Sequence, residues 1–93
     1  MNDLQECALC GMEDALEQHH LIPRAMHKRK WFRNRFSKDE MKLRTVDICP
    51  LCHTFIHRQW SEKELGSELN TVGKLLETDL VQNFITYARK QTR

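Results

Sequence analysis

The last third of the chain carries apolar residues at helical spacing. Ser61 with Glu64 has the pattern of a capping box before this segment, and Asp79 can cap a final helix. The apolar positions, three or four residues apart or adjacent on one face, are Leu65, Leu69, Val72, Leu75, Leu76, Leu80, Val81, Phe84, Ile85 and Ala88. We therefore expect a helical tail over residues 61–91.

Short strand patterns occur earlier in the chain. Residues 45–48 alternate as a strand does, and residues 18–22 form a second short strand that Pro23 ends. Residues 3–12 are expected to form a hairpin. The strands and the helices together predict an α+β fold.

Two further helices are expected between these strands and the tail. Residues 37–43 begin with a second capping-box pattern, formed by Ser37 and Glu40. Residues 50–60 are expected to form a helix because Pro50 suits the first helical position.

The composition fits one small soluble domain over residues 1–93. Of the 93 residues, 40% are hydrophobic and 30% are charged, and so short a chain has room for a single core. The longest uncharged run, residues 48–57, is too short to cross a bilayer. The acidic start lacks the apolar region of a signal peptide. We expect no membrane partner and a cytoplasmic location.

The net charge of +2 conceals a strong asymmetry. Residues 1–22 contain acidic residues and no Lys or Arg, whereas residues 23–44 contain nine Lys or Arg and two acids. Residues 45–93 are balanced. The middle block is expected to present a cationic surface, for which a polyanion is the natural partner.

The four cysteines form two C-x-x-C pairs, Cys7 with Cys10 and Cys49 with Cys52. Two such pairs supply the four thiolates that a tetrahedral zinc requires. A core this small needs the added stability of such a cross-link. Gly11 follows the first pair, where the turn around a metal requires a positive φ. The spacing predicts a structural Zn²⁺ site.

Four histidines lie close to the cysteine pairs. His53 and His57 are one helical turn apart and share a face, while His19 and His20 are adjacent on a strand and should point to opposite faces. This paired pattern predicts a second metal site rather than more ligands for the first. His27, within the basic segment of residues 24–38, is expected to be a solvated side chain.

Three segments in this order and spacing resemble the HNH endonucleases. They are the C-x-x-C of residues 7–10, HHLIPR at residues 19–24 and ICPLCHTFIH at residues 48–57. The resemblance implies a small ββα-metal (His-Me finger, treble-clef) core over residues 7–58, with a structural zinc. The segment WSEKELGSELNTVGKLLE is similar to a helical extension of small stand-alone bacterial HNH proteins, which implies a tail over residues 61–91 packed on the core.

The resemblance also implies a role for each histidine and an activity. His20 would be the general base that activates water, and His19, where many relatives carry Asp, would bind the catalytic cation with His53 and His57. That cation would be Mg²⁺, Mn²⁺, Ni²⁺ or Zn²⁺. The implied function is a metal-dependent DNA endonuclease or nickase that leaves 5′-phosphate and 3′-hydroxyl ends.

The sequence departs from the HNH pattern at its middle position. The family usually carries an Asn on the second strand, which braces the loop and the general base. Here the aligned positions are Arg44 and Thr45. The Thr45 hydroxyl is the candidate for the missing hydrogen bond.

The basic segment predicts contacts with DNA phosphates, which would make binding salt-dependent. Its aromatic residues could stack on bases, but Phe32 and Phe36, one helical turn apart, are expected to anchor the segment to the core. Arg58 could contact phosphate or simply be a solvated residue at a helix end. The candidate phosphate-binding residues are Arg24, Lys28, Arg29, Lys30, Arg33, Arg35 and Arg58.

Two other functions fit parts of the sequence. The basic segment alone would suit a non-catalytic, zinc-dependent DNA-binding module, in which the four histidines near the cysteines would not matter. The helical tail would suit a small interaction protein, but a chain this short needs those apolar residues for its own core. The adjacent pair His19 and His20 favours the nuclease.

Overall fold

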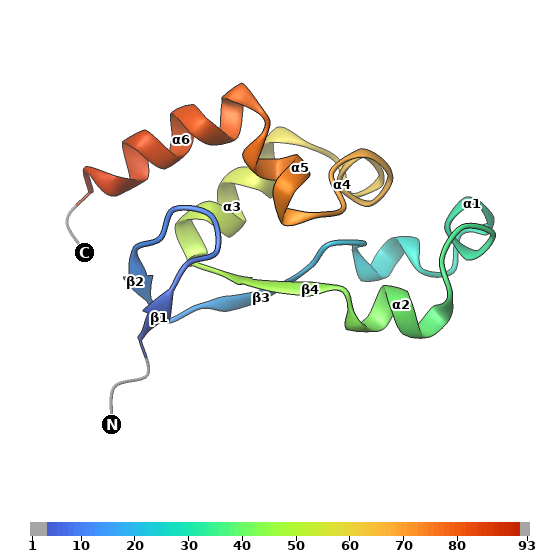
Figure 1. The fold of residues 1–93 in the computed structure, drawn as a ribbon. Helices are drawn as coiled ribbons and strands as arrows, with labels where there is room; N and C mark the ends of the chain where they lie inside the picture. Colours follow the sequence, from blue (N-terminus) through green and yellow to red (C-terminus); the bar gives the residue numbers. More distant parts are fainter. Residues whose placement is uncertain (1–3, 92–93) are drawn as a thin grey trace.

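A computed structural model describes residues 4–91 of the chain, in which short strands alternate with helices (Figure 1). In chain order the elements are β1 (Gln5–Glu6), β2 (Glu13–Asp14), β3 (Glu17–His20), the 3₁₀ helix η1 (Arg24–Met26), α1 (Lys30–Arg33), α2 (Lys38–Leu43), β4 (Thr45–Ile48), α3 (Pro50–Gln59), α4 (Glu62–Glu68), α5 (Val72–Leu76) and α6 (Asp79–Arg89). The predicted α+β class is confirmed.

The first hairpin is a small antiparallel pair of β1 and β2, in which Gln5 lies opposite Asp14. It extends to residue 14, beyond the predicted 3–12, and residue 3 lies outside the described residues. Gly11 has φ +77°, as expected of the turn in this hairpin. The backbone N–H of Gly11 donates to the Cys7 carbonyl at 2.9 Å and closes the turn.

The second sheet pairs β3 with β4 in antiparallel register. His19 lies opposite Val46, and His20 lies opposite Thr45. The predicted strand 45–48 is confirmed. The predicted strand 18–22 instead spans Glu17–His20, although the N–H of Leu21 still donates to the carbonyl of Arg44 at 2.9 Å.

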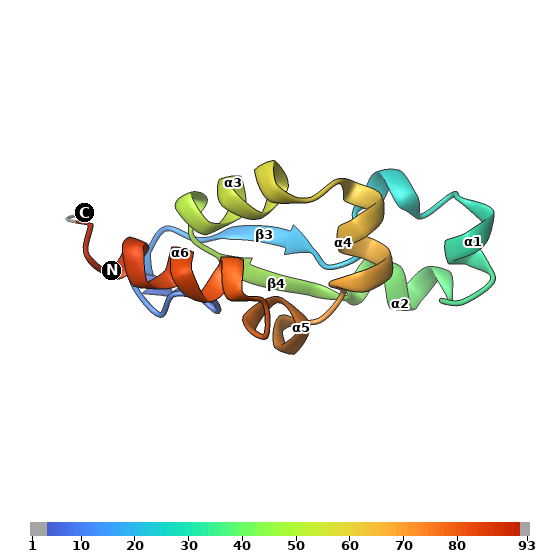
Figure 2. The same ribbon diagram turned by 90° about the horizontal axis from the view of Figure 1, so that it is seen from above.

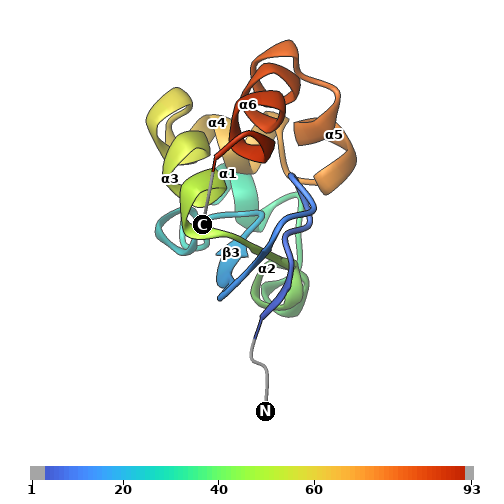
Figure 3. The same ribbon diagram turned by 90° about the vertical axis from the view of Figure 1, so that its left-hand side faces the viewer.

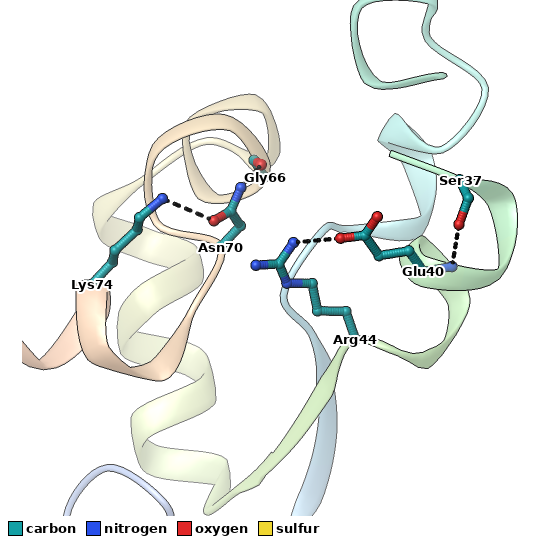
Figure 4. A network of polar contacts seen from close by, with 6 residues as sticks. All are labelled: Ser37, Glu40, Arg44, Gly66, Asn70 and Lys74. Carbon is teal, nitrogen blue, oxygen red and sulfur yellow. Dashed lines mark hydrogen bonds and ion pairs between the residues drawn. The ribbon is translucent and has the colours of Figure 1, made fainter. Parts of the chain in front are cut away.

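Two helix starts follow from their capping residues. Cys49 is the N-cap of α3, and its Sγ accepts the N–H of Cys52 at 3.4 Å. Ser37 caps α2 by accepting the N–H of Glu40 at 3.0 Å. The carboxylate of Glu40 pairs with Arg44 at 3.3 Å, so the predicted capping box is only half formed (Figure 4).

The tail is broken into more helices than its apolar periodicity suggests. α4 begins with a complete capping box of Ser61 and Glu64, but it ends at Glu68. The side chain of Asn70, which is only 4% exposed, donates to the Gly66 carbonyl at 2.9 Å and accepts from Lys74 Nζ at 3.2 Å (Figure 4). Asn70 thus supplies a hydrogen-bond donor to a backbone carbonyl at the end of α4, and it contacts Lys74 of α5.

The last helix is capped one residue earlier than predicted. Thr78 is its N-cap and accepts the N–H of Val81 at 3.1 Å, while Asp79 lies in the first turn. Val81, Ile85 and Ala88 are buried as expected. The prediction for Leu80 was wrong, because this side chain is 48% exposed.

Most of the tail lies with α3 on one side of the β3–β4 sheet, and the β1–β2 hairpin lies at one end (Figures 1 and 2). The view along the sheet shows α3, α5 and α6 gathered above the strands (Figure 3). The rings of Phe55 in α3 and Phe84 in α6 are stacked at 4.0 Å between centroids. Arg89 Nε donates to the Cys10 carbonyl at 2.8 Å, which ties α6 to the hairpin.

The core consists of two apolar clusters. The larger cluster is formed by buried residues of the first hairpin, β4, α3 and the tail. The second, smaller cluster lies at the opposite end, under η1, α1 and α2. It consists of Ile22, Met26, Phe32 and Met41, with the half-buried Phe36 packed against it. The expectation that Phe32 and Phe36 anchor the basic segment is therefore confirmed. α4 closes this cluster so tightly that a Cβ added to Gly66 would lie 2.9 Å from the Phe32 ring.

Within the described part of the chain, no helix is both long enough and apolar enough to cross a membrane.

Candidate functional site

Four cysteine side chains from two distant segments meet beside the first hairpin. Cys7 and Cys10 come from the hairpin, Cys49 and Cys52 come from the start of α3, and all four are buried. Their sulfur atoms lie within 4.8 Å of one another, and Sγ of Cys10 is 3.8 Å from Sγ of Cys49. A tetrahedral zinc with Zn–S bonds of about 2.3 Å has sulfurs about 3.8 Å apart. The cluster can therefore hold a structural metal such as zinc.

Backbone N–H groups surround these sulfurs. Sγ of Cys7 accepts from the N–H groups of Leu9, Cys10 and Cys49 at 3.4, 3.5 and 3.3 Å. A hydrogen bond from the Cys52 thiol lowers the pKa of Cys7 to about 4, with help from these N–H groups and against the effect of burial. The same hydrogen bond, together with burial, raises the pKa of Cys52. These hydrogen bonds thus favour the thiolate form of Cys7, which is the form that binds a metal.

A second cluster joins β3 to α3. His19, His53 and His57 place one ring nitrogen each within 4.8 Å of the others. The ring centroids of His19 lie 5.3 Å from His53 and 5.2 Å from His57, and the two α3 rings are 4.8 Å apart. His19 is buried, His53 is half-buried and His57 is exposed, so the cluster is open to solvent on one side.

The deepest histidine has a nitrogen that needs a partner. His19 is 1% exposed, and its Nε2 has no hydrogen-bond partner among the described residues. Burial, followed by the neighbouring charges of His57, His53 and His20, lowers the pKa of His19 to about 3. A neutral imidazole with a buried, unpaired nitrogen is the form that binds a metal, and leaving that nitrogen unpaired is costly. The three histidines therefore fit a divalent cation.

Glu17 orients one of these ligands. Its Oε1 accepts a hydrogen bond from Nδ1 of His53 at 2.9 Å. This bond leaves Nε2 of His53 as the nitrogen with a free lone pair. A carboxylate behind a metal-binding histidine is the usual outer partner in such sites, where it fixes the orientation of the ring.

His20 lies on the opposite face of β3 from His19, as strand alternation predicts. Thr45 is directly across from it on β4, and the Thr45 hydroxyl accepts from Gln18 Nε2 at 3.4 Å. A role for Thr45 toward His20 stays a prediction. Burial, then the charges of His27 and Arg24, lower the pKa of His20.

The prediction of a solvated His27 was wrong. This side chain is half-buried, and its Nε2 donates to the Ile22 carbonyl at 2.6 Å. Its ring centroid lies 6.0 Å from that of His20. His27 therefore stabilises the turn that follows β3, and its ring lies beside that of His20.

A pocket of about 760 Å³ opens next to His20 and His27, between η1 and α2. We call it the basic pocket, because its lining includes five Lys or Arg residues and no carboxylate. The five are Arg24, Lys28, Arg33, Lys38 and Lys42.

Comparison with known proteins shows a relative that is similar to this chain in sequence. The chain is 30% identical over 86 residues to YisB, an uncharacterized protein of Bacillus subtilis (strain 168), and the alignment covers 91% of this chain and 74% of YisB. The chain belongs to the YisB family. No protein-family model matches it, and no solved structure matches it significantly.

In this member of the YisB family, not all of the predicted phosphate-binding residues line the basic pocket. Arg24, Lys28 and Arg33 line the basic pocket, whereas Arg35 is placed elsewhere. The Arg35 guanidinium lies 3.9 Å from the centroid of the Trp31 ring and donates to the Trp31 carbonyl at 3.1 Å. Of the others, Arg29, Lys30 and Arg58 are exposed and do not line the pocket.

Sequence reasoning missed Glu17, His27 and Lys42 as residues of these sites. Glu17 could have been found, because it precedes His19 by two positions and strand alternation puts both on one face. Lys38 and Lys42 are one helical turn apart, so α2 presents them together. No sequence signal points to the turn that brings His27 to His20.

Proposed function

We propose that this chain is a metal-dependent DNA endonuclease or nickase of the HNH type, with a ββα-metal core stapled by structural zinc. The observation that carries the proposal is the cluster of His19, His53 and His57, whose deepest nitrogen lacks a partner among the described residues, directly next to His20. The order β3, β4, α3 is the element order that such a core requires.

His20 is the proposed general base. In hydrolysis it accepts a proton from the water whose oxygen attacks phosphorus, while the bond from phosphorus to the 3′ oxygen breaks. This role needs a neutral imidazole, and the lowered pKa of His20 favours that form at neutral pH. Since burial, His27 and Arg24 together lower this pKa, the surroundings of His20 favour the neutral base.

The histidine cluster is the proposed cation site. When bound there, a divalent cation would supply Lewis-acid stabilisation of the phosphate and the leaving oxygen. His19 anchors the site from β3, and His53, held by Glu17, completes it from α3 with His57. The exposed side of the cluster, next to His57, leaves room for a phosphate.

DNA is the proposed substrate because of the charge next to His20. The five cations of the basic pocket would contact backbone phosphates, which gives affinity without base recognition.

The first test is plasmid relaxation by zinc-loaded protein. Wild type and His20→Ala are each assayed with added Mg²⁺, Mn²⁺ or Ni²⁺ and without an added cation. We expect cation-dependent nicking that falls by about 10²-fold or more in His20→Ala, because general-base catalysis contributes that much. His57→Ala serves as the second variant, since it should lose activity through weaker cation binding while His20→Ala keeps that binding.

Identical nicking by wild type and His20→Ala, or no nicking with any cation, would contradict the nuclease. The basic pocket favours a second candidate, a non-catalytic DNA-binding module that depends on zinc. That candidate requires salt-sensitive DNA binding that is unchanged in His20→Ala and His57→Ala.

A further inference from the structure

The basic pocket has an apolar side as well as a cationic one. Phe36 and Met41 contribute to its lining, and both belong to the small cluster under η1 and α2. Phe36 is half-buried, while Met41 is only 2% exposed. The pocket therefore combines an aromatic ring with cations, all within reach of one small ligand.

The size of the pocket restricts what can occupy it. A volume of about 760 Å³ lies within the range of about 300–1,000 Å³ that small-ligand pockets span. Paired bases in a duplex are stacked on their neighbours and cannot enter a concave site unless they leave the helix. An aromatic ring beside cations is the combination that proteins use to hold single strands, because any base can stack and every nucleotide brings a phosphate.

Resting on the nuclease function proposed above, we propose that the basic pocket holds one unpaired nucleotide next to the phosphodiester that is cut. The base packs against Phe36, and the flanking phosphates contact Arg24, Lys38 and Lys42. The preferred substrate is then a single strand, or a duplex with an unpaired nucleotide, rather than a fully paired duplex.

The position of His20 connects this pocket to the reaction. His20 lines the pocket on one face of β3, and His19, the preceding residue, belongs to the proposed cation site on the other face. A nucleotide held in the pocket would place its neighbouring phosphate near His20, the proposed general base. The acids of α2 leave this arrangement intact, because Glu40 is paired with Arg44 at 3.3 Å and neither Asp39 nor Glu40 lines the pocket.

The experiment measures binding without cleavage. Zinc-loaded protein, in buffer with no added divalent cation, is titrated into three labelled DNAs followed by fluorescence anisotropy: a thymidine hexamer, a fully paired hairpin, and the same hairpin with one bulged nucleotide. A uridine hexamer distinguishes a ribonucleotide from a deoxyribonucleotide as the occupant. Gels of the titrated samples verify that the DNA stays intact.

Matched variants test whether the DNA binds in the basic pocket. Phe36→Leu removes the ring but keeps an apolar side chain in the small cluster, and Trp31→Leu is its control at an exposed ring outside the pocket. Lys42→Gln removes an exposed pocket cation, and Lys63→Gln is its control in α4. Because Lys42 is exposed, its replacement tests the pocket even if Phe36→Leu disturbs folding.

We expect the bulged hairpin to bind about tenfold more tightly than the paired one. Phe36→Leu should weaken binding of the hexamer and the bulged hairpin by about tenfold, since stacking on a base is worth ~1–3 kcal/mol. Lys42→Gln should reduce the slope of log affinity against log salt by about 0.7 for the hexamer. Both control variants should behave as wild type.

Equal affinity for the two hairpins, or equal effects of Phe36→Leu and Trp31→Leu, would overturn the inference. Cleavage is not measured here, so these outcomes are separate from the plasmid test. If the protein binds the bulged hairpin through Phe36 but cuts no DNA, the assignment of the pocket stands and the proposed nuclease function fails.

Discussion

At the scale of single residues, Glu17 determines how His53 faces the histidine cluster. Its carboxylate accepts from Nδ1 of His53 at 2.9 Å, which leaves Nε2 for a metal. Glu17 is itself half exposed, with 51% of its side chain accessible, so it adds little to the core. Its contribution is expected in the affinity for a cation rather than in stability.

Replacing Glu17 should therefore weaken cation binding, and more strongly with Ala than with Gln. Glu17→Ala should reduce affinity for Ni²⁺ about tenfold or more, the usual effect of losing such an outer partner. Glu17→Gln keeps an acceptor for Nδ1 but loses the charge, so its affinity should fall between those of wild type and Glu17→Ala. Titration calorimetry of zinc-loaded protein with Ni²⁺ measures this series, with Glu13→Gln in β2 as the control. Three equal affinities would show that Glu17 does not support the site.

The residues that could be predicted from sequence are those whose chemistry depends on local spacing. A single helical turn brings Cys49 close to Cys52 and His53 close to His57, and strand alternation places His19 and His20 on opposite faces of β3. His27 could not be predicted, because its contact with the Ile22 carbonyl depends on the path of the turn after Pro23.

At the scale of elements, Gly66 sets how closely α4 approaches the basic segment. A Cβ at this position would lie 2.9 Å from Phe32 Cε1 and 3.2 Å from Pro23 Cδ. Phe32 is buried and cannot move aside freely. Gly66 thus permits a close packing of the tail on the second cluster, and this contact links the tail to Pro23 and Phe32.

Alanine should have opposite effects at the two glycines of the tail. Ala in place of Gly within a helix ordinarily stabilises by ~0.5–1 kcal/mol, whereas overpacking costs ~1–3 kcal/mol. Gly66→Ala should therefore reduce the free energy of unfolding by about 1 kcal/mol. Gly73→Ala in α5, where an added Cβ meets only Thr71 Oγ1 at 3.9 Å, should raise it by about 0.5 kcal/mol. Urea denaturation of the zinc-loaded proteins measures both, and a stabilising Gly66→Ala would disprove the tight contact.

The starts of α2 and α4 could be predicted from the sequence, whereas the end of α4 could not. Ser37 and Ser61 begin helices because a side-chain oxygen accepts an N–H a few residues on, a local interaction that the sequence reveals. The end of α4 depends on Asn70, which is buried against the Gly66 carbonyl and Lys74. Apolar spacing continues through this break, so periodicity alone predicts more continuous helix than the chain forms.

At the scale of the whole molecule, the cysteine cluster joins parts that are far apart in sequence. It connects the first hairpin to α3, and Arg89 of α6 donates to the Cys10 carbonyl at 2.8 Å. All four cysteines belong to the larger apolar cluster, which also holds buried residues of α4, α5 and α6. The hairpin strands β1 and β2 have only two residues each and cannot hold this end of the molecule by themselves.

Removal of zinc should therefore unfold the larger cluster and with it the histidine site. Because α3 presents both Cys52 and His53, loss of the metal at its first turn releases the element that carries His53 and His57. In a Trp31→Phe background, Trp60 is the remaining tryptophan, and it packs against the larger cluster. A strong chelator should shift its fluorescence to the red, reduce helical circular dichroism and abolish Ni²⁺ binding, and added Zn²⁺ should restore all three. Cooperative thermal unfolding that persists after verified zinc loss would mean that apolar packing of α3 and α6 alone holds the histidines in place.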